Sequence, residues 1–149
     1  MALANELGAA GERAAQRYLL SRHIHLLEVN WRDPLCEIDI IASDGRHLLI
    51  VEVKSRMEYT ATSPLDAVDQ AKAHQMMLGG MRYAQRMRID LPIRYDVIEA
   101  LYCPASDLFE IKYHKGYFSA EEIALHEPPP TAPSSPNGGT LVRPAGSRQ

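Results

Sequence analysis

Four charged side chains interrupt two short apolar segments in the first half of the chain, and their types and spacing suit chemistry. Glu37 and Asp39 alternate with isoleucines in the first segment, and Glu52 and Lys54 alternate with valines in the second. In a β-strand, residues of equal parity point to the same face, so each pair shares one side of its strand. Carboxylates gathered in this way are the oxygen ligands that a hard divalent cation prefers.

The turn between the two segments decides whether the pairs meet. Asp44-Gly45 is a strong signal for a hairpin with a two-residue turn. That turn would place Glu37 opposite Glu52, and Asp39 would then face Ile50. Three carboxylates and one lysine would share one face, and repulsion among the carboxylates would favour a bound Mg²⁺ or Mn²⁺ ion. A three-residue loop would instead send Glu37 and Glu52 to opposite faces.

An ordinary solvated surface is the competing interpretation of these charges. Strands with one wet face often alternate Glu and Lys, and cross-strand ion pairs there are common surface features. Here, however, the charges are surrounded by apolar residues of both parities: Ile38, Ile40, Ile41, Leu49, Ile50, Val51 and Val53. Strands of this kind are buried on both faces, where a charge is costly unless it is compensated. The apolar setting therefore favours a functional site.

The elements that must position these residues follow the order αβββαββ. Apolar residues at spacings of three and four predict a helix over residues 3–20. A second helix is expected from Pro64, with Ser63 as its N-cap, to about Met87. The predicted strands are residues 23–31, 36–43, 47–55, 93–102 and 108–114, and a short last helix is expected over 119–125. This order predicts an α/β fold with a central mixed five-stranded sheet flanked by helices.

Length and composition predict one domain. A chain of 149 residues with 46% hydrophobic residues can form a single core, which we place in residues 1–126. Residues 128–149 hold 6 Pro and 3 Gly in 22 positions, so residues 127–149 are expected to be a disordered tail.

Charge and cysteine usage narrow the class of protein further. No apolar run has the roughly 18 residues of a membrane helix, and charges at Glu6, Glu12 and Arg13 disfavour a signal peptide, so a cytoplasmic protein is expected. Cys36 and Cys103 lie far apart, which suggests neither a disulfide framework nor a zinc ribbon. A net charge of −3 argues against a surface that coats nucleic acid broadly, so any such contact must be local.

The segments Glu37–Ala42 and Val51–Lys54 resemble the D…(D/E)xK signature of restriction-endonuclease-like nucleases. More closely, the chain resembles the YraN-like family of bacterial proteins. The matching positions are Gly11-Glu12, Asn30, the EIDIIA and VEVKSR segments, Lys72 and Arg94-Tyr95-Asp96-Val97. This resemblance covers about two thirds of the chain and implies a fold similar to archaeal Holliday-junction resolvases, with nucleolytic activity.

The resemblance and the chemistry of phosphodiesters together imply roles for these residues. Asp39 and Glu52, with the Val53 carbonyl, would hold Mg²⁺, and Lys54 would orient the attacking water and stabilise the transition state. Glu37 would hold a metal-bound water or a second ion. Glu12 resembles the extra carboxylate of resolvase-like enzymes, although a solvated edge glutamate is an equal alternative.

Contacts with the substrate are placed at Arg56, two residues after Lys54, and at Lys72 in the second helix. Arg94 and Asp96 share a strand face, where a structural ion pair and a role in the site are equally consistent with the sequence. One position departs from the family, because Cys36 stands where a glycine is usual. Cysteine tolerates a positive φ poorly, so this substitution bears on the geometry beside the site.

Three functions are consistent with these observations. The first is a metal-dependent endonuclease acting on DNA, with branched or single-stranded DNA in repair or recombination as candidate substrates. A homodimer would suit the two-fold symmetry of a junction, but no segment identifies a dimer face. The second is a nucleic-acid-binding module with little turnover on the same scaffold, and the third is a protein-interaction adaptor. The negative net charge favours the enzyme, since carboxylates beside phosphate require a metal.

Overall fold

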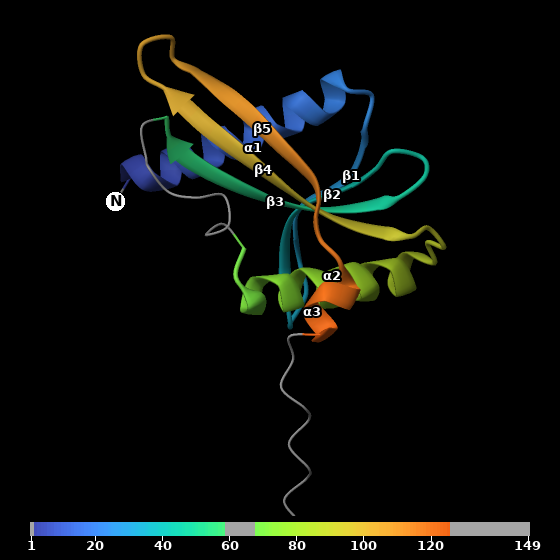
Figure 1. Cartoon of the computed structure of the whole chain (residues 1–149). Coiled ribbons are helices and arrows are strands. Elements are labelled where there is room, and N and C mark those ends of the chain that lie inside the picture. Colours follow the sequence, from blue (N-terminus) through green and yellow to red (C-terminus); the bar gives the residue numbers. More distant parts are fainter. Residues whose placement is uncertain (1, 59–67, 126–149) are drawn as a thin grey trace, which may run out of the picture.

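The computed structural model describes residues 2–58 and 68–125. In chain order the elements are α1 (Ala2–Ser21), β1 (His25–Arg32), β2 (Glu37–Ser43), β3 (Leu48–Met57), α2 (Gln70–Met87), β4 (Ile93–Cys103), β5 (Leu108–Phe118) and α3 (Ala120–Leu125) (Figure 1). The predicted order αβββαββ and the short last helix are confirmed. The expected tail at residues 127–149 lies outside the described residues.

The five strands form one mixed sheet in which spatial order follows chain order, β1-β2-β3-β4-β5. The β1–β2, β2–β3 and β4–β5 pairs are antiparallel, whereas β3 and β4 run parallel. A parallel pair needs a crossover connection, and α2 lies in that connection, below the sheet in Figure 1. This is the mixed sheet predicted from the sequence, and it has the restriction-endonuclease-like arrangement.

The two faces of the sheet are buried by different helices. On one face, Ala15 and Leu19 of α1 pack against Ile40, Leu49 and Val51. On the other face, α2 packs its buried residues against those of the sheet: Ala73, Met76 and Tyr83 against Ile38, Ile41, Leu48, Ile50 and Tyr95. The central strands are thus buried on both sides, as their apolar sequences predicted. None of the helices in the described ranges is long and apolar enough to cross a lipid bilayer.

Close packing of α1 on the sheet depends on Gly11. A Cβ added there would lie 1.9 Å from Ser55 Oγ and 2.9 Å from Ser55 Cβ, so rotation of the serine side chain could not relieve the overlap. We expect Gly11→Ala to lower the free energy of unfolding by about 1–3 kcal/mol. Gly8→Ala on the same helix, with nothing within 4 Å, should raise it by about 0.5–1 kcal/mol. Urea denaturation of both variants checks this, and equal effects of the two substitutions would contradict it.

The register of the β2–β3 hairpin differs from the predicted one. Ile50 faces Ile41, two residues later than the Asp39 that a two-residue turn would give. The loop has four residues because the Asp44 carboxylate accepts hydrogen bonds from the N–H groups of Arg46 at 2.8 Å and His47 at 2.7 Å. A shift of two residues makes Asp39 rather than Glu37 the carboxylate nearest Glu52. The alternation of side chains also breaks at Asp39, because Ile40 packs on the α1 face whereas Ile38 packs with Ile41 on the α2 face, so the prediction that Glu37 shares the face of Glu52 is wrong.

The predicted start of the second helix is also wrong. α2 begins at Gln70, and the extended residue Asp69 (φ −81°, ψ 177°) is its N-cap. The Asp69 carboxylate accepts a hydrogen bond of 2.8 Å from the N–H of Lys72, which satisfies a donor that the first turn leaves unpaired. The predicted cap at Ser63 lies outside the described residues.

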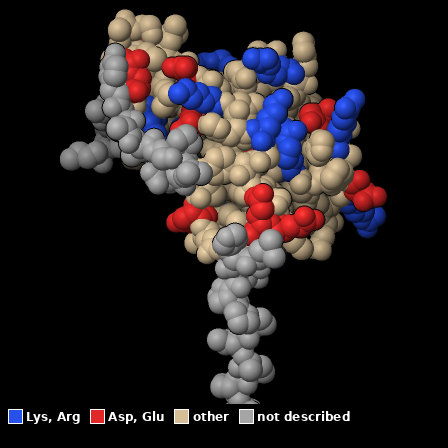
Figure 2. Space-filling model, in the orientation of Figure 1, with Lys and Arg blue, Asp and Glu red and all other residues tan. Residues whose placement is uncertain are grey.

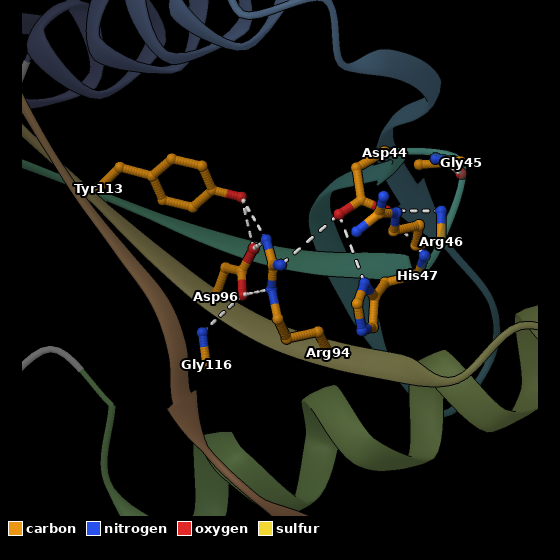
Figure 3. A network of polar contacts seen from close by, with 9 residues as sticks. Asp44, Gly45, Arg46, His47, Arg94, Asp96, Tyr113 and Gly116 are labelled. Atoms are coloured by element: carbon orange, nitrogen blue, oxygen red, sulfur yellow. Dashed lines mark hydrogen bonds and ion pairs between the residues drawn. The ribbon is translucent and has the colours of Figure 1, made fainter.

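Arg94 and Asp96 form a structural brace rather than part of the candidate site. Asp96 is fully buried and accepts hydrogen bonds from the Arg94 guanidinium, the Tyr113 hydroxyl and the Gly116 N–H. Arg94 also lies 3.6 Å from Asp44 in the β2–β3 loop (Figure 3). Tyr113 contacts Tyr18 of α1 edge to face, so the network ties the loop, β4 and β5 together beneath α1. Of the two roles open from sequence, the structural ion pair accounts for these contacts.

Candidate active site

Asp39 and Glu52 meet where β2 and β3 separate. The backbone ladder between these strands ends at the pair Ile40 and Val51. One residue further along β2, Asp39 Oδ2 accepts a hydrogen bond of 2.8 Å from the N–H of Val53. A side-chain oxygen thus replaces the backbone carbonyl as partner, and the gap between the strands is occupied by carboxylates.

The two carboxyl groups perturb each other strongly. Burial is the largest cause that raises the pKa of Glu52, to about 8, and the negative charge of Asp39 is the second. A side-chain interaction with Asp39 raises the pKa of Glu52 further. Two acidic groups this close in a poorly solvated gap resist ionising together unless a cation compensates them.

Lys72 supplies part of that compensation. Its ammonium, from the first turn of α2, lies 3.3 Å from Glu52 Oε2 and opposes the rise of the Glu52 pKa. From its place in the sequence, Lys72 is expected to contact nucleic acid. In the structure it is the counter-ion of Glu52, at a position from which it reaches the same gap.

Glu12 approaches the gap from the other face of the sheet, on α1. Its pKa is raised by burial and then by Asp39, while a hydrogen bond with the Asn30 side chain acts in the opposite direction. Asn30 itself has a positive φ of 50° within β1. The Asn30 side chain, which the family resemblance included without a role, therefore orients Glu12. Sequence parity could not have shown this contact, because it joins a helix to the point where two strands part.

Glu37 and Lys54 lie at the exposed rim of the gap. Glu37 forms an ion pair of 3.1 Å with Arg32, directly across the β1–β2 ladder. Lys54 is exposed and lies two residues after Glu52, on the same face of β3. Arg56 follows on that face after two more residues. The structure therefore brings Asp39, Glu52, Lys72 and Glu12 together, with Glu37 near Glu12, whereas Lys54 and Arg56 lie further along β3.

The donor set suits a divalent cation bound by two protein carboxylates. Within residues 2–58 and 68–125, no three Asp, Glu, His or Cys side chains converge as a preformed metal centre. Mg²⁺ is commonly held by one or two carboxylates, with waters and substrate phosphate oxygens completing its shell. Asp39 and Glu52 match this arrangement, since their mutual repulsion is what a cation would relieve.

Cys36 fits its position without strain, although the family resemblance predicted glycine there. It lies outside the set of described residues with positive φ, and the residue is 7% exposed. Its N–H and thiol both donate to Asp33 Oδ1, and Asp33 is in turn paired with Arg82 of α2. Burial raises the pKa of Cys36 to about 11, so it stays a thiol. This Asp33–Cys36–Arg82 contact, which the sequence did not indicate, fixes the start of β2 beside the site.

Comparison with known proteins places the chain in a family. The model of the uncharacterised protein family UPF0102 matches residues 11–100. The chain belongs to this family. A UPF0102 protein of Parabacteroides distasonis is 39% identical over 98 residues, covering 66% of this chain and 81% of its own length. UPF0102 proteins of Thermodesulfovibrio yellowstonii (39% over 93 residues, 62% and 83%) and Porphyromonas gingivalis (33% over 118 residues, 79% and 87%) are also similar.

Membership of UPF0102 confirms the YraN-like resemblance seen in the sequence. The matched range contains every residue of the gap, from Glu12 to Lys72. The family description and the names of these relatives specify no reaction. Chemistry must therefore be argued from the side chains.

The raised pKa of Glu52 predicts how stability depends on pH. A carboxyl whose pKa is raised by folding binds more protons in the folded chain than in the unfolded one, so stability falls as pH rises from about 4.5 to about 8. We expect the free energy of unfolding, measured with urea in EDTA, to be higher at pH 5 than at pH 8. Glu52→Gln should remove most of this difference. Glu37→Gln, which removes an exposed carboxylate, should leave it, and a Glu52→Gln profile parallel to the wild type would contradict the prediction.

Proposed function

We propose that this protein is a metal-dependent endonuclease that hydrolyses phosphodiester bonds in DNA. The observation that carries the proposal is the Asp39–Glu52 pair, two carboxyl groups forced together in a half-buried gap, with exposed Lys54 on the same strand as Glu52. Acidic groups repel a phosphate backbone, so their place at a nucleic-acid site makes sense when they hold a cation. A bound Mg²⁺ or Mn²⁺ would withdraw charge from the phosphate and lower the pKa of a bound water.

Each residue of the gap then has a role. Asp39 and Glu52, with the Val53 carbonyl, would hold the ion. Lys54 stays outside the buried pair, where its ammonium orients the attacking water and stabilises the negative charge of the transition state. The remaining residues support these: Glu12 and Glu37 hold waters at the two rims, and Arg56 and Lys72 hold phosphate oxygens of the substrate. Lys72 becomes available for this role when the ion replaces it at Glu52.

The distribution of charge supports a local contact with nucleic acid. The net charge of −3 gives no overall attraction to DNA. Figure 2 nevertheless shows Lys and Arg side chains grouped over the middle of one face, while Asp and Glu lie mostly toward its margins. This grouping supports a local contact with DNA, and branched or single-stranded DNA is the substrate that we propose.

A binding module without turnover is the second candidate, and the Lys72–Glu52 ion pair is the observation that favours it. A tethered ammonium 3.3 Å from Glu52 compensates that charge without a metal. In this case Asp39 and Glu52 would be structural, and Lys54, Arg56 and Lys72 would grip nucleic acid.

Cleavage assays distinguish the two candidates. Purified protein is incubated with labelled duplex, single-stranded and four-way-junction DNA, with Mg²⁺ or Mn²⁺ in one arm and EDTA in the other. The nuclease predicts cleavage that requires the metal and is strongest on junction or single-stranded DNA. Binding in both arms without cleavage would identify the module, and the absence of both binding and cleavage would overturn both.

A further inference from the structure

Two acidic residues of the described part of the chain are less than 5% exposed, and both lie on β4. Asp96, on the α1 face, is compensated by a permanent cation, a hydroxyl and a backbone N–H, which together account for its burial. Glu99 is 4% exposed and accepts one hydrogen bond among the described residues, from His114 Nε2 at 2.8 Å. A buried carboxylate costs several kcal/mol unless it is well compensated, and a single imidazole compensates it fully only when protonated. The contacts of Asp96 therefore account for its burial, whereas the single hydrogen bond to Glu99 does not by itself account for the burial of Glu99.

The strand register connects the Glu99–His114 pair to the candidate active site. Glu99 is the ladder partner of Lys54, and paired residues point to the same face. In the neighbouring row, Glu52 pairs with Val97, which in turn pairs with His114. One face of β3, β4 and β5 thus carries two adjacent rows, Lys54–Glu99–Lys112 and Glu52–Val97–His114, in which His114 is the group that the structure shows hydrogen-bonded to Glu99. His114 is 33% exposed, so its ring is open to a ligand on that face.

Distance decides what His114 could do. Two strand spacings of about 4.8 Å place its backbone roughly 10 Å from that of Glu52. Asp39 lies on β2, one strand further from β5 than Glu52, so a phosphate held between Asp39 and Glu52 lies on the far side of Glu52 from His114. This position favours a contact with a neighbouring phosphate over proton transfer to the reacting one, which requires about 2.6–3.2 Å. A neighbouring nucleotide of the same strand lies within reach, because nucleotides repeat at only a few Å along a strand.

We propose that His114, oriented by Glu99, contacts the phosphate backbone of the bound strand next to the phosphodiester held at Asp39 and Glu52. This inference rests on the proposed nuclease. It extends the surface that would contact the bound strand from β3 to β5. His114 Nε2 is held by Glu99, which leaves Nδ1 as the donor to a phosphate oxygen when the ring is protonated. Glu99 is a positioning residue, since it acts through the imidazole.

The neighbouring residue provides a matched control. Lys115 also carries a positive charge on β5, but it lies on the opposite face, 5.5 Å from the Tyr113 ring. Affinity for labelled single-stranded and junction DNA is measured by fluorescence anisotropy with Ca²⁺ in place of Mg²⁺, between 50 and 200 mM salt. His114→Gln keeps a hydrogen-bond donor to Glu99 but cannot carry charge, whereas His114→Lys keeps the charge.

We expect His114→Gln to weaken binding roughly 5- to 20-fold, the factor for losing one charge-assisted hydrogen bond. The slope of log K against log salt should fall by about 0.7–0.9, whereas His114→Lys should restore both and Lys115→Gln should stay within about twofold of the wild type. In Mg²⁺, Glu99→Gln should raise KM for cleavage more than it lowers kcat. A His114→Gln protein that binds like the wild type, or a Lys115→Gln protein weakened equally, would overturn the inference.

The same measurements separate this inference from the nuclease itself. A wild-type protein that binds DNA with the expected dependence on His114 but never cleaves it would overturn the nuclease and support the His114 contact. A protein that cleaves DNA with no dependence on His114 would do the reverse. A wild-type protein that binds no DNA would overturn both.

Discussion

Replacing Asp39 with asparagine is expected to abolish metal-dependent cleavage while making the metal-free protein more stable. Asparagine keeps the shape of the side chain, and its carbonyl oxygen still accepts the hydrogen bond from the Val53 N–H. What it removes is one of the two charges that would hold the ion. Because a catalytic metal contributes several kcal/mol to transition-state stabilisation, we expect a loss of about 10³-fold or more in cleavage rate.

The gain in stability has a separate physical cause. Asp39 raises the pKa of Glu52, which means that the two groups repel each other in the folded chain. Neutralising one of them should raise the free energy of unfolding in EDTA at pH 8 by about 1 kcal/mol or more, the energy of a pKa shift of roughly one unit. Loss of activity together with a gain of stability is typical of a residue retained for function rather than for folding.

Rates on labelled DNA, Mn²⁺ uptake by calorimetry and urea denaturation would test both halves of this prediction. Glu6→Gln provides the control, because it removes one exposed carboxylate from α1 and should change none of the three measurements. An Asp39→Asn protein that still cleaves at the wild-type rate would place the metal elsewhere. One that is less stable than the wild type would show that Asp39 is mainly structural.

The fold could be predicted from the sequence because local pattern and burial agree along most of the chain. In the central strands, odd-numbered and even-numbered residues are both mostly apolar, which predicts burial on both faces. Helices α1 and α2 do bury the two faces of the sheet. Gly79 and Gly80, which would weaken an isolated helix, lie within α2 where it approaches the sheet. A Cβ at these positions would come within 2.8 Å of Ile38 and 3.0 Å of Ile50. Tertiary packing explains why the helix continues through them.

The hairpin register could not be predicted because it depends on the Asp44 side chain. Asp-Gly is compatible with a two-residue turn, but the Asp44 carboxylate instead binds two successive N–H groups and lengthens the loop. The start of α2 was missed for a similar reason, since both Ser63 and Asp69 can cap a helix and sequence alone does not rank them. In each case one side-chain hydrogen bond decides the boundary.

Strand parity indicated candidate residues for the site, but several of their contacts depend on the three-dimensional arrangement of strands and helices, which parity does not specify. Equal parity placed Glu52 with Lys54 on β3, but it failed on β2, where Ile38 and Ile40 lie on opposite faces and the alternation breaks at Asp39. It could not show that β2 and β3 separate at Asp39, which lets Glu12 of α1 and Lys72 of α2 approach one gap from opposite faces. Nor could it relate Glu99 to Lys54, because that pairing requires knowing that β4 lies parallel beside β3.

Replacing Lys54 with methionine should separate catalysis from metal binding. Lys54 is exposed and lies outside the buried pair, so Asp39 and Glu52 should still take up Mn²⁺ in its absence. If its ammonium stabilises the charge that develops on the phosphate, the cleavage rate should fall about 10²–10³-fold, as for loss of one preorganised donor. Methionine has a side chain of similar length without the charge, so packing along β3 should be unchanged.

The contrast between the two substitutions identifies the roles of the residues. Single-turnover cleavage and calorimetric Mn²⁺ uptake should both be lost in Asp39→Asn, whereas Lys54→Met should lose cleavage alone. Lys115→Met removes a positive charge from the opposite face of β5 and should affect neither measurement. A Lys54→Met protein that cleaves normally would mean that the ammonium only binds substrate. If that variant lost metal uptake as well, the Lys54 ammonium would be needed to balance the charge of the carboxylates. The proposal that Asp39 and Glu52 hold the metal while Lys54 acts only in catalysis would then be wrong.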